Sequence, residues 1–317
     1  TQRFTTYTDE LFPKADVMST YLKDFAKTNQ LNIAYNQEVF EIIQLEDKSF
    51  LVKTTRKESY KCKTLLSALG PLQENFPEEI EGIQHATTYA NQLTDLEKYK
   101  NKRVAIIGGG NSAFETAEYL SGTAAFVHVL LKEPLKFAWE SHFVGDLRAV
   151  NNGIVDMYQL KSMHAVLLPR VKRIEKKGAF LQTFHEYDFP EASPPGTLKL
   201  SREYDFIINC TGWKWMNLSL FKEDSLPATN PSQDFPLLKS NWESTNIENL
   251  YFIGSTMRAI DKQSASGFIH GFRYNIRTLF QLLLEKNHAI NYPKDIYQIK
   301  EDGEKFMNFF YNRISTA

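Results

Sequence analysis

The feature that most constrains the fold is a run of three glycines, residues 108–110, placed between an apolar segment and an amphipathic one. Residues 103–107 before the glycines have the composition of a buried β-strand, and residues 111–121 after them have the periodicity of a helix. A second apolar strand is predicted over residues 126–131. Strand, glycine turn, helix and strand in about 30 residues predict one βαβ unit of a parallel sheet.

The glycine run continues into a Gly-x-Gly-x-x-Ala pattern, a version of the dinucleotide-binding fingerprint. Gly108 permits the tight turn, Gly110 lets a pyrophosphate approach the backbone, and small Ala113 lets the helix pack on the strand. The helix N-terminus would then face the phosphates. We predict dinucleotide binding rather than a merely structural turn, through Gly108, Gly109, Gly110, Asn111, Ser112 and Ala113.

The end of the second strand bears on the choice between NADP and NAD. An NAD site usually places a carboxylate there for the ribose hydroxyl, whereas NADP needs a cation for its phosphate. Lys132 stands at this position, and Lys136 adds positive charge nearby, which favours NADP. Two alternatives stay open: Glu133 is the ribose ligand of an NAD site, or Lys132 is an ordinary solvated lysine.

Two further glycines each follow a predicted buried strand. Gly70 follows residues 64–69, and Gly212 follows residues 206–209 and Thr211. With Asp205 and the aromatic Trp213, the second site has the pattern Asp-x-x-x-x-x-Thr-Gly-aromatic. This pattern is similar to the crossovers that join the two domains of two-dinucleotide flavoproteins, and such proteins have two of them.

Longer runs extend this resemblance over most of the chain. Residues 108–115, GGGNSAFE, are similar to flavin-dependent monooxygenases. Residues 139–160, WESHFVGDLRAVNNGIVDMYQL, and residues 266–277, SGFIHGFRYNIR, resemble FAD-dependent oxidoreductase domain-containing proteins of the flavin-monooxygenase-like kind. Residues 81–89, which include His85, partly resemble the linking sequence that identifies flavin monooxygenases.

The resemblance implies an α/β fold of the two-dinucleotide-binding-domain type. A discontinuous FAD domain, residues 1–94 and 206–317, would surround an NAD(P)H-binding domain at residues 95–205. The family is identified as one of oxidoreductases in which NADPH reduces FAD and the flavin passes electrons to oxygen or an organic acceptor. We name no catalytic side chain, because the chain offers no triad or paired carboxylates whose spacing can be interpreted.

The resemblance also implies residues that contact FAD. The run ending in Gly254-Ser255 resembles the late FAD-binding strand, although Ser255 stands where many such proteins have aspartate. A helix predicted over residues 266–286 would direct its N-terminal N–H groups, near Ser266 and Gly267, at the flavin. The N-terminal FAD fingerprint that the family places before Phe4 is missing, and we expect the sequence to be a piece of a longer protein.

The remaining elements complete the predicted FAD side. Apolar residues at helical spacing predict a surface helix over residues 15–28, packed on a sheet. Three short runs, residues 37–45, 49–54 and 59–67, predict an antiparallel meander that ends in the buried strand. A short strand is predicted over residues 250–253.

Composition narrows the remaining possibilities. A formal net charge of −1 and a pI near 6.6 give no field that would gather nucleic acid, and no apolar run is long enough to span a bilayer. Cys62 and Cys210 are too far apart in sequence for a Cys-x-x-Cys redox pair or a zinc site, so we predict two free thiols and no metal. The partners expected are a small-molecule substrate or oxygen.

Two other functions stay open. One is a thiol-disulfide reductase that acts on a partner's thiols, and the other is a noncatalytic dinucleotide-binding or interaction module. The composition favours a bacterial cytoplasm, and the resemblance leaves the endoplasmic reticulum lumen as the alternative.

Overall fold

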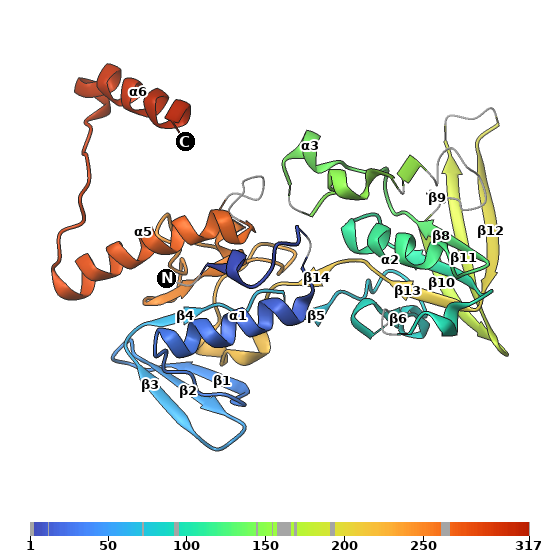
Figure 1. Cartoon of the computed structure of the whole chain (residues 1–317), viewed down its shortest axis with the longest axis horizontal. Coiled ribbons are helices and arrows are strands. Elements are labelled where there is room, and N and C mark those ends of the chain that lie inside the picture. Colours follow the sequence, from blue (N-terminus) through green and yellow to red (C-terminus); the bar gives the residue numbers. More distant parts are fainter. Residues whose placement is uncertain are drawn as a thin grey trace.

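The structure is a computed structural model of the 317-residue chain. It describes residues 3–11, 13–71, 73–91, 95–143, 145–153, 155–156, 166–167, 170–190, 194–260 and 267–316. The elements gather into two lobes, which two short antiparallel strands connect (Figure 1). We call them the nucleotide lobe, which contains the glycine run, and the flavin-side lobe, which contains α1 and α5.

The nucleotide lobe is built on a five-stranded sheet whose neighbouring strands all pair in parallel. Its strands, in spatial order, are β6 (Thr87–Thr88), β13 (Phe206–Asn209), β7 (Arg103–Ile107), β8 (Phe126–Leu130) and β9 (Val166–Leu167). Helix α2 (Asn111–Ser121) joins β7 to β8. The predicted βαβ unit is confirmed, with β8 one residue shorter than predicted.

Both faces of this sheet are buried, as the alternation of side chains along β7 shows. Val104 and Ile106 pack on one face with Phe114 of α2, while Ala105 and Ile107 pack on the other. A strand covered on both faces has a continuous run of apolar residues, and this run is why β7 could be predicted from the sequence. The predicted domain boundaries at residues 94 and 205 stay predictions, although β6 joins this sheet from before residue 95.

A three-stranded antiparallel meander, which the sequence did not reveal, covers the second face. It consists of β10 (Arg170–Lys177), β11 (Phe180–Phe189) and β12 (Gly196–Tyr204). Val171, Ile174 and Tyr204 of this meander are buried against the sheet. Gly178 turns between β10 and β11 with a φ of 60°. This glycine was the residue in the sequence that could have indicated the hairpin.

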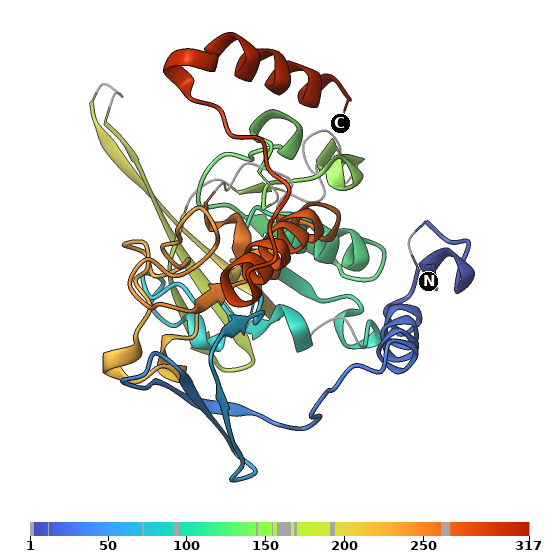
Figure 2. The same cartoon turned by 90° about the vertical axis from the view of Figure 1, so that its left-hand side faces the viewer.

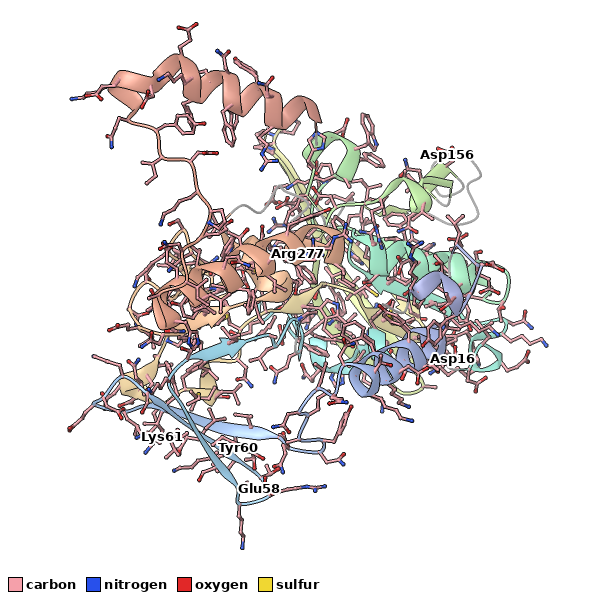
Figure 3. All side chains as sticks on the ribbon, turned by 60° about the vertical axis from the view of Figure 1, so that its left-hand side comes forward. Asp16, Glu58, Tyr60, Lys61, Asp156 and Arg277 are labelled. Carbon is pink, nitrogen blue, oxygen red and sulfur yellow. The ribbon has the colours of Figure 1, made fainter. Side chains whose placement is uncertain are left out.

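The flavin-side lobe contains smaller sheets. The meander β1 (Val39–Gln44), β2 (Phe50–Thr54) and β3 (Ser59–Cys62) is antiparallel, as predicted. The turn between β2 and β3 contains Glu58, whose carboxylate accepts a hydrogen bond from the Tyr60 hydroxyl (Figure 3).

The predicted run over residues 59–67 is wrong as a single strand, because its second half belongs to another sheet. There β4 (Leu65–Ser67) pairs in parallel with β15 (Leu250–Phe252). The prediction of a buried strand is also wrong, since Leu66 and Leu69 are both more than 40% exposed. The partner strand β15 is buried along its whole length, so the exposure is confined to β4.

The two lobes are connected by β5 (Gln73–Glu74), which leaves the flavin-side lobe, and β14 (Trp213–Lys214), which returns to it. They pair with each other, with Glu74 opposite Trp213 (Figure 1). The two crossovers therefore lie side by side.

The other α-helices of the described residues are α1 (Ala15–Thr28), α3 (Ala138–Ser141), α5 (Ile269–His288) and α6 (Ile299–Thr316). Helix α1 has the predicted bounds, but none of its residues is buried. Helix α6 stands apart from both lobes in two perpendicular views (Figures 1 and 2). Within the described ranges, no helix combines the length and apolarity needed to cross a membrane.

Candidate functional site

The glycine run forms the turn between β7 and α2, and Gly108 is held there by a close backbone approach. Its φ is 143°, and a Cβ atom at this position would lie 2.3 Å from the carbonyl oxygen of Cys210. Cys210 follows β13, the neighbour of β7 in the sheet. The carboxyl ends of two parallel strands thus meet at this turn, where open α/β sheets bind their ligands.

Helix α2 begins with N–H groups that no side chain of the described residues caps. Gly110 is its N-cap residue, with extended backbone and no side-chain hydrogen bond. Uncapped N–H groups at a helix N-terminus, together with the helix dipole, favour an anion. Ala113 is completely buried in the core cluster on this face of the sheet, at the position where the fingerprint has a small residue.

Asn111 fixes the neighbouring loop against this turn. Its side-chain amide donates to the carbonyl oxygen of Asp146 at 2.7 Å, and its carbonyl oxygen accepts from the Arg148 N–H at 2.9 Å and the Asn151 amide at 2.8 Å. These residues belong to the run over residues 139–160 that carries part of the family resemblance. The side chain of Asn111 is therefore occupied with positioning this loop.

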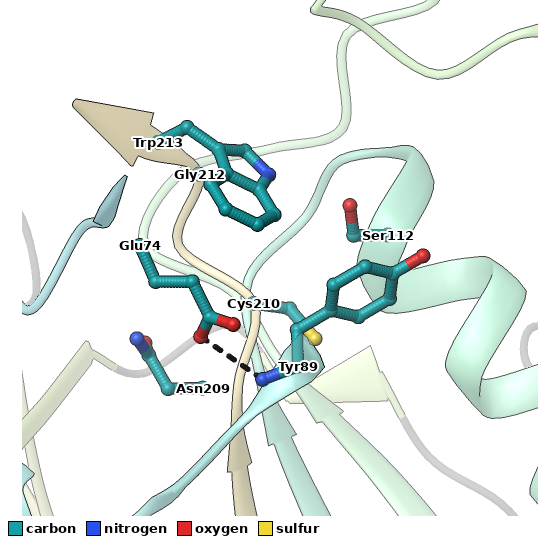
Figure 4. A pocket seen from close by; sticks show the side chains of 7 residues that line it. All are labelled: Glu74, Tyr89, Ser112, Asn209, Cys210, Gly212 and Trp213. Atoms are coloured by element: carbon teal, nitrogen blue, oxygen red, sulfur yellow. Dashed lines mark hydrogen bonds between the residues drawn. The ribbon is translucent and has the colours of Figure 1, made fainter. Parts of the chain in front are cut away.

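A small pocket lies between the glycine turn and the two crossovers (Figure 4). The carboxylate of Glu74 accepts from the backbone N–H groups of Tyr89 at 3.0 Å and Ala90 at 2.7 Å. The Tyr89 ring lies edge-on to Trp213, with 6.5 Å between centroids. The pocket lining is Glu74, Tyr89, Ser112, Asn209, Cys210, Gly212 and Trp213.

Cys210 contributes a thiol that is poorly suited to redox chemistry. Burial raises its pKa to about 12, and its sulfur lies 3.9 Å from the Thr116 hydroxyl. Since the thiolate is the reactive form, a thiol with this pKa is inert at neutral pH. Cys62 is half-buried and also free, so the prediction of two free cysteines is confirmed.

The returning crossover is held by hydrogen bonds around Asn75. The Asn75 carbonyl oxygen accepts from the Asn209 amide at 2.7 Å and the Thr211 hydroxyl at 2.8 Å, and its N–H donates to the Gly212 carbonyl at 2.9 Å. Gly212 has a φ of 95°, a conformation that favours glycine. Asp205, at the start of the same motif, accepts from the Arg103 N–H at 2.7 Å.

Lys132 lies just past β8, as predicted, and has a partner from the outgoing crossover segment. The Lys132 ammonium donates to the Glu79 carboxylate at 2.8 Å. This bond is the main reason that the pKa of Glu79 lies below its ordinary value. Arg170 donates to the Lys132 carbonyl at 3.4 Å, which brings a second cation to the same place. Lys136 pairs instead with Glu133 at 3.2 Å.

On the flavin-side lobe, pairing of β4 with β15 brings the predicted glycines to one edge. A Cβ atom on Gly70 would lie 3.7 Å from the hydroxyl oxygen of Ser255. Gly70 has a φ of 64° and Gly254 a φ of 71°, so each turns in a conformation that favours glycine. This edge is thus formed by Gly70 and Ser255, which lie 185 positions apart in the sequence.

Helix α5 begins at Ile269, three residues later than predicted. Its N-cap, Phe268, makes no side-chain cap, and its first turn holds no acidic residue. Gly267 immediately precedes the cap, while Ser266 lies outside the described residues.

The predicted residues therefore fall at two places. Gly108 to Ala113 and Gly212 meet at the turn between β7 and α2, which we call the nucleotide turn. Gly70, Gly254 and Ser255 meet at the flavin-side edge. Sequence reasoning missed Glu74, which lines the pocket, and Arg170, which reaches Lys132. Neither belongs to a motif, and only the position of Glu74 shortly after the glycine of the first crossover could have indicated it.

Comparison with known proteins gives a family match over most of the chain. The family model described as pyridine nucleotide-disulphide oxidoreductase matches residues 2–254. FAD-dependent oxidoreductase domain-containing protein 2 from Mus musculus is 32% identical over 94% of this chain and 48% of its own length. The chain thus spans about half the length of this relative.

Solved structures share the fold. Bacillithiol disulfide reductase from Staphylococcus aureus has a TM-score of 0.67 and 20% identity, over 88% of this chain and 80% of its own. A flavin-containing monooxygenase from Stenotrophomonas maltophilia has a TM-score of 0.64 and 18% identity, over 88% and 79%. The predicted fold class, a two-dinucleotide-binding-domain flavoprotein, is confirmed.

Proposed function

Because the chain belongs to the pyridine nucleotide-disulphide oxidoreductase family, we propose that the whole protein is an NADPH-dependent FAD oxidoreductase. Bound NADPH would supply a hydride to FAD, and the reduced flavin would supply electrons to oxygen or an organic acceptor. The protein's part is to hold the two dinucleotides and to orient them.

The observation that carries this proposal is the antiparallel pairing of the two crossovers. Glu74 on the outgoing crossover lies opposite Trp213 on the returning one. Glu74 also holds the Tyr89 and Ala90 N–H groups at the entrance to the nucleotide lobe. The crossovers thus connect the glycine turn of one lobe to the glycine edge of the other, as transfer between two dinucleotides requires.

The residues present fit a nicotinamide dinucleotide at the nucleotide turn. Gly108 cannot carry a side chain, the N-terminus of α2 is uncapped, and the strand ends form the expected crevice. Gly108, Gly110 and Ser112 would hold the pyrophosphate, and Tyr89 and Trp213 would border the ring end of the cofactor.

The flavin-side edge fits part of FAD. Gly70 and Gly254 turn away from their strands beside the Ser255 hydroxyl, which can hydrogen-bond to a ribityl or phosphate oxygen. The uncapped start of α5, beside Gly267, would stabilise negative charge on the reduced ring. The sequence contains one glycine fingerprint, so the pyrophosphate of FAD has no such motif among these 317 residues.

The cations near the end of β8 favour NADP over NAD. Lys132 and Arg170 converge there, and Glu133 is engaged by Lys136 rather than directed alone at a ribose. A 2′-phosphate would compete with Glu79 for the ammonium of Lys132.

Thiol-disulfide chemistry would have to use a partner's thiols. Cys210 is buried with a pKa raised to about 12, and burial also raises the pKa of Cys62. Neither residue offers a reactive thiolate. The likeness to a bacillithiol disulfide reductase therefore supports the fold and leaves the acceptor to experiment.

The test is to purify the full-length protein and record its flavin absorbance before and after anaerobic NADPH, with NADH as the comparison. Bleaching by NADPH supports the proposal. A protein that carries flavin but bleaches faster with NADH contradicts the choice of NADP. A colourless protein that still binds NADPH contradicts flavin reduction and supports a noncatalytic dinucleotide-binding module.

A further inference from the structure

Arg258 is a buried cation with no hydrogen-bond or ion-pair partner among the described residues. It lies in the short helical turn Gly254–Ala259 that follows β15, and it is 5% exposed. Its Nε atom is fully shielded and has no hydrogen-bond partner in the described part of the chain. No carboxylate among the described residues forms an ion pair with it.

Aromatic rings surround the guanidinium instead. Its central carbon lies 4.2 Å from the ring centroid of Trp215, 5.0 Å from that of Phe235 and 5.4 Å from that of Phe143. Trp215 and Phe235 are stacked, with 5.6 Å between centroids.

Phe143 ties this aromatic cluster to the nucleotide turn. Its ring lies against Gly145, where a Cβ atom would meet the ring at 2.4 Å. The Gly145 carbonyl oxygen in turn faces Gly110 of the fingerprint. Arg258 itself follows Ser255 of the flavin-side edge by three residues. The guanidinium thus lies at the seam where residues of both lobes meet.

No anionic group among the described residues compensates the charge of Arg258. Burial lowers the pKa of Arg258, but an arginine stays protonated in proteins, so it cannot escape the cost by losing its proton. Removing a cation from water without a counter-ion is strongly unfavourable, and aromatic faces return only part of that cost. Such an arrangement is favourable when an anion completes it.

The guanidinium and the aromatic rings at the seam indicate which class of anion would bind there. The guanidinium fork matches the two oxygens of a carboxylate, and a single cation neutralises a monoanion but not a phosphate dianion. The flanking rings of Trp215 and Phe235 favour an apolar or aromatic body attached to that carboxylate. We propose that Arg258 binds the carboxylate of an apolar or aromatic organic acid at the seam between the lobes.

This inference names the class of the organic acceptor and in that respect rests on the proposed function. Binding of the acid does not depend on flavin reduction, so the two can fail separately. Arg258 would position the acid between the nucleotide turn and the flavin-side edge.

The experiment titrates the full-length protein with benzoate and follows tryptophan fluorescence, because Trp215 lies against the guanidinium. Arg258→Met should weaken benzoate binding by about tenfold to a hundredfold, since it removes a charge-assisted pair of hydrogen bonds. Arg258→Lys keeps the charge but loses the fork and should also bind more weakly. Trp215→Phe should abolish most of the fluorescence change.

Arg277→Met is the matched control. Arg277 is an exposed arginine on α5 of the flavin-side lobe and lies over the ring of Tyr274 (Figure 3). Its loss should leave benzoate binding unchanged. Thermal unfolding with and without benzoate provides a second readout: the midpoint of the wild type should rise with benzoate, and that of Arg258→Met should not.

Equal benzoate affinity in wild type and Arg258→Met overturns the proposal and makes Arg258 a packing residue. Inorganic phosphate that binds as well as benzoate overturns the choice of a carboxylate. Wild-type protein that binds benzoate through Arg258 but shows no NADPH-dependent bleaching leaves this site intact and rejects the proposed function.

Discussion

The nucleotide lobe and the flavin-side lobe bury their sheets to different degrees. In the nucleotide lobe, α2 covers one face of the parallel sheet and the β10–β12 meander covers the other, and Val104, Ile106 and Phe114 are completely buried. In the flavin-side lobe, β4 and β15 form a sheet of two strands, and Leu66 is 44% exposed.

This difference in burial indicates where each lobe obtains its stability. Parallel sheets are normally covered on both faces, and the nucleotide lobe meets this requirement with its own residues. In the flavin-side lobe the exposed apolar groups include Leu66 of β4 and Leu69 just after it, whereas no residue of β7 is exposed. We infer that the nucleotide lobe is stable by itself, whereas the flavin-side lobe gains stability from what binds against it, FAD included.

The largest expected effect tests this difference in burial. Phe114→Ala should lower the free energy of unfolding by about 3–5 kcal/mol, because it leaves a cavity between α2 and the sheet. Leu22→Ala on exposed α1 is the matched change in the other lobe and should cost less than about 0.5 kcal/mol. Urea denaturation of both variants provides the measurement. Equal losses would contradict the proposed contrast between the lobes.

A pair of glycine substitutions compares the two binding edges. Gly108→Ala should cost about 2–3 kcal/mol and abolish NADPH binding, because the new Cβ atom would strike the Cys210 carbonyl in a backbone conformation reserved for glycine. Gly254→Ala has open space around it, and only its φ of 71° opposes the change, at about 1 kcal/mol. Calorimetric NADPH binding and urea midpoints measure both effects. A Gly108→Ala variant with normal NADPH affinity would refute the assignment of the turn.

The same contrast explains how much could be predicted from the sequence. β7 and α2 were predicted with their observed bounds because fingerprint, periodicity and burial agree there. β4 was overestimated in length and burial, because an apolar run does not show whether a sheet will cover it. The partner of Lys132, Glu79, comes from 53 positions away and belongs to no motif, so only the folded chain brings the two together.

An intermediate effect is expected at an ion cluster around buried Glu243 that fixes α5 to the rest of the flavin-side lobe. Burial alone would raise the pKa of Glu243, but the Asn249 N–H and the ammonium groups of Lys239 and Lys286 hold it below the ordinary value. A depressed pKa contributes stability that is present above the unfolded-state pKa, near 4.3, and is lost as the pH falls through the folded-state value. Glu243→Gln should therefore cost about 1–2 kcal/mol at pH 7 and less at pH 4.

Urea midpoints at the two pH values measure this dependence. Glu58→Gln is the control, since Glu58 lies at the exposed turn of the β1–β3 meander (Figure 3). Glu58→Gln should cost less than about 0.5 kcal/mol at either pH. A Glu243→Gln variant that loses equal stability at pH 7 and pH 4 would show that Glu243 acts through packing rather than through its charge.

The smallest expected effect concerns the choice between NADP and NAD at the nucleotide lobe. Lys132 and Glu79 are each 57% exposed, so their ion pair contributes little to stability, and a 2′-phosphate can displace the carboxylate. Lys132→Ala should weaken NADPH binding by about twofold to fivefold and leave NADH binding unchanged. Glu79→Gln should have the opposite sign, because it releases the ammonium for the phosphate.

Two controls make this small effect decisive. Lys136→Ala removes a cation that is paired with Glu133, and it should change NADPH affinity less than Lys132→Ala does. Glu133→Gln tests the alternative of an NAD site, because a ribose ligand at residue 133 would make this variant lose NADH affinity. A Lys132→Ala variant that binds both nucleotides equally weakly would mean that Lys132 shapes the turn without recognising the phosphate. The choice of cofactor would then rest on Arg170, which approaches the same place from β10 of the meander that the sequence concealed.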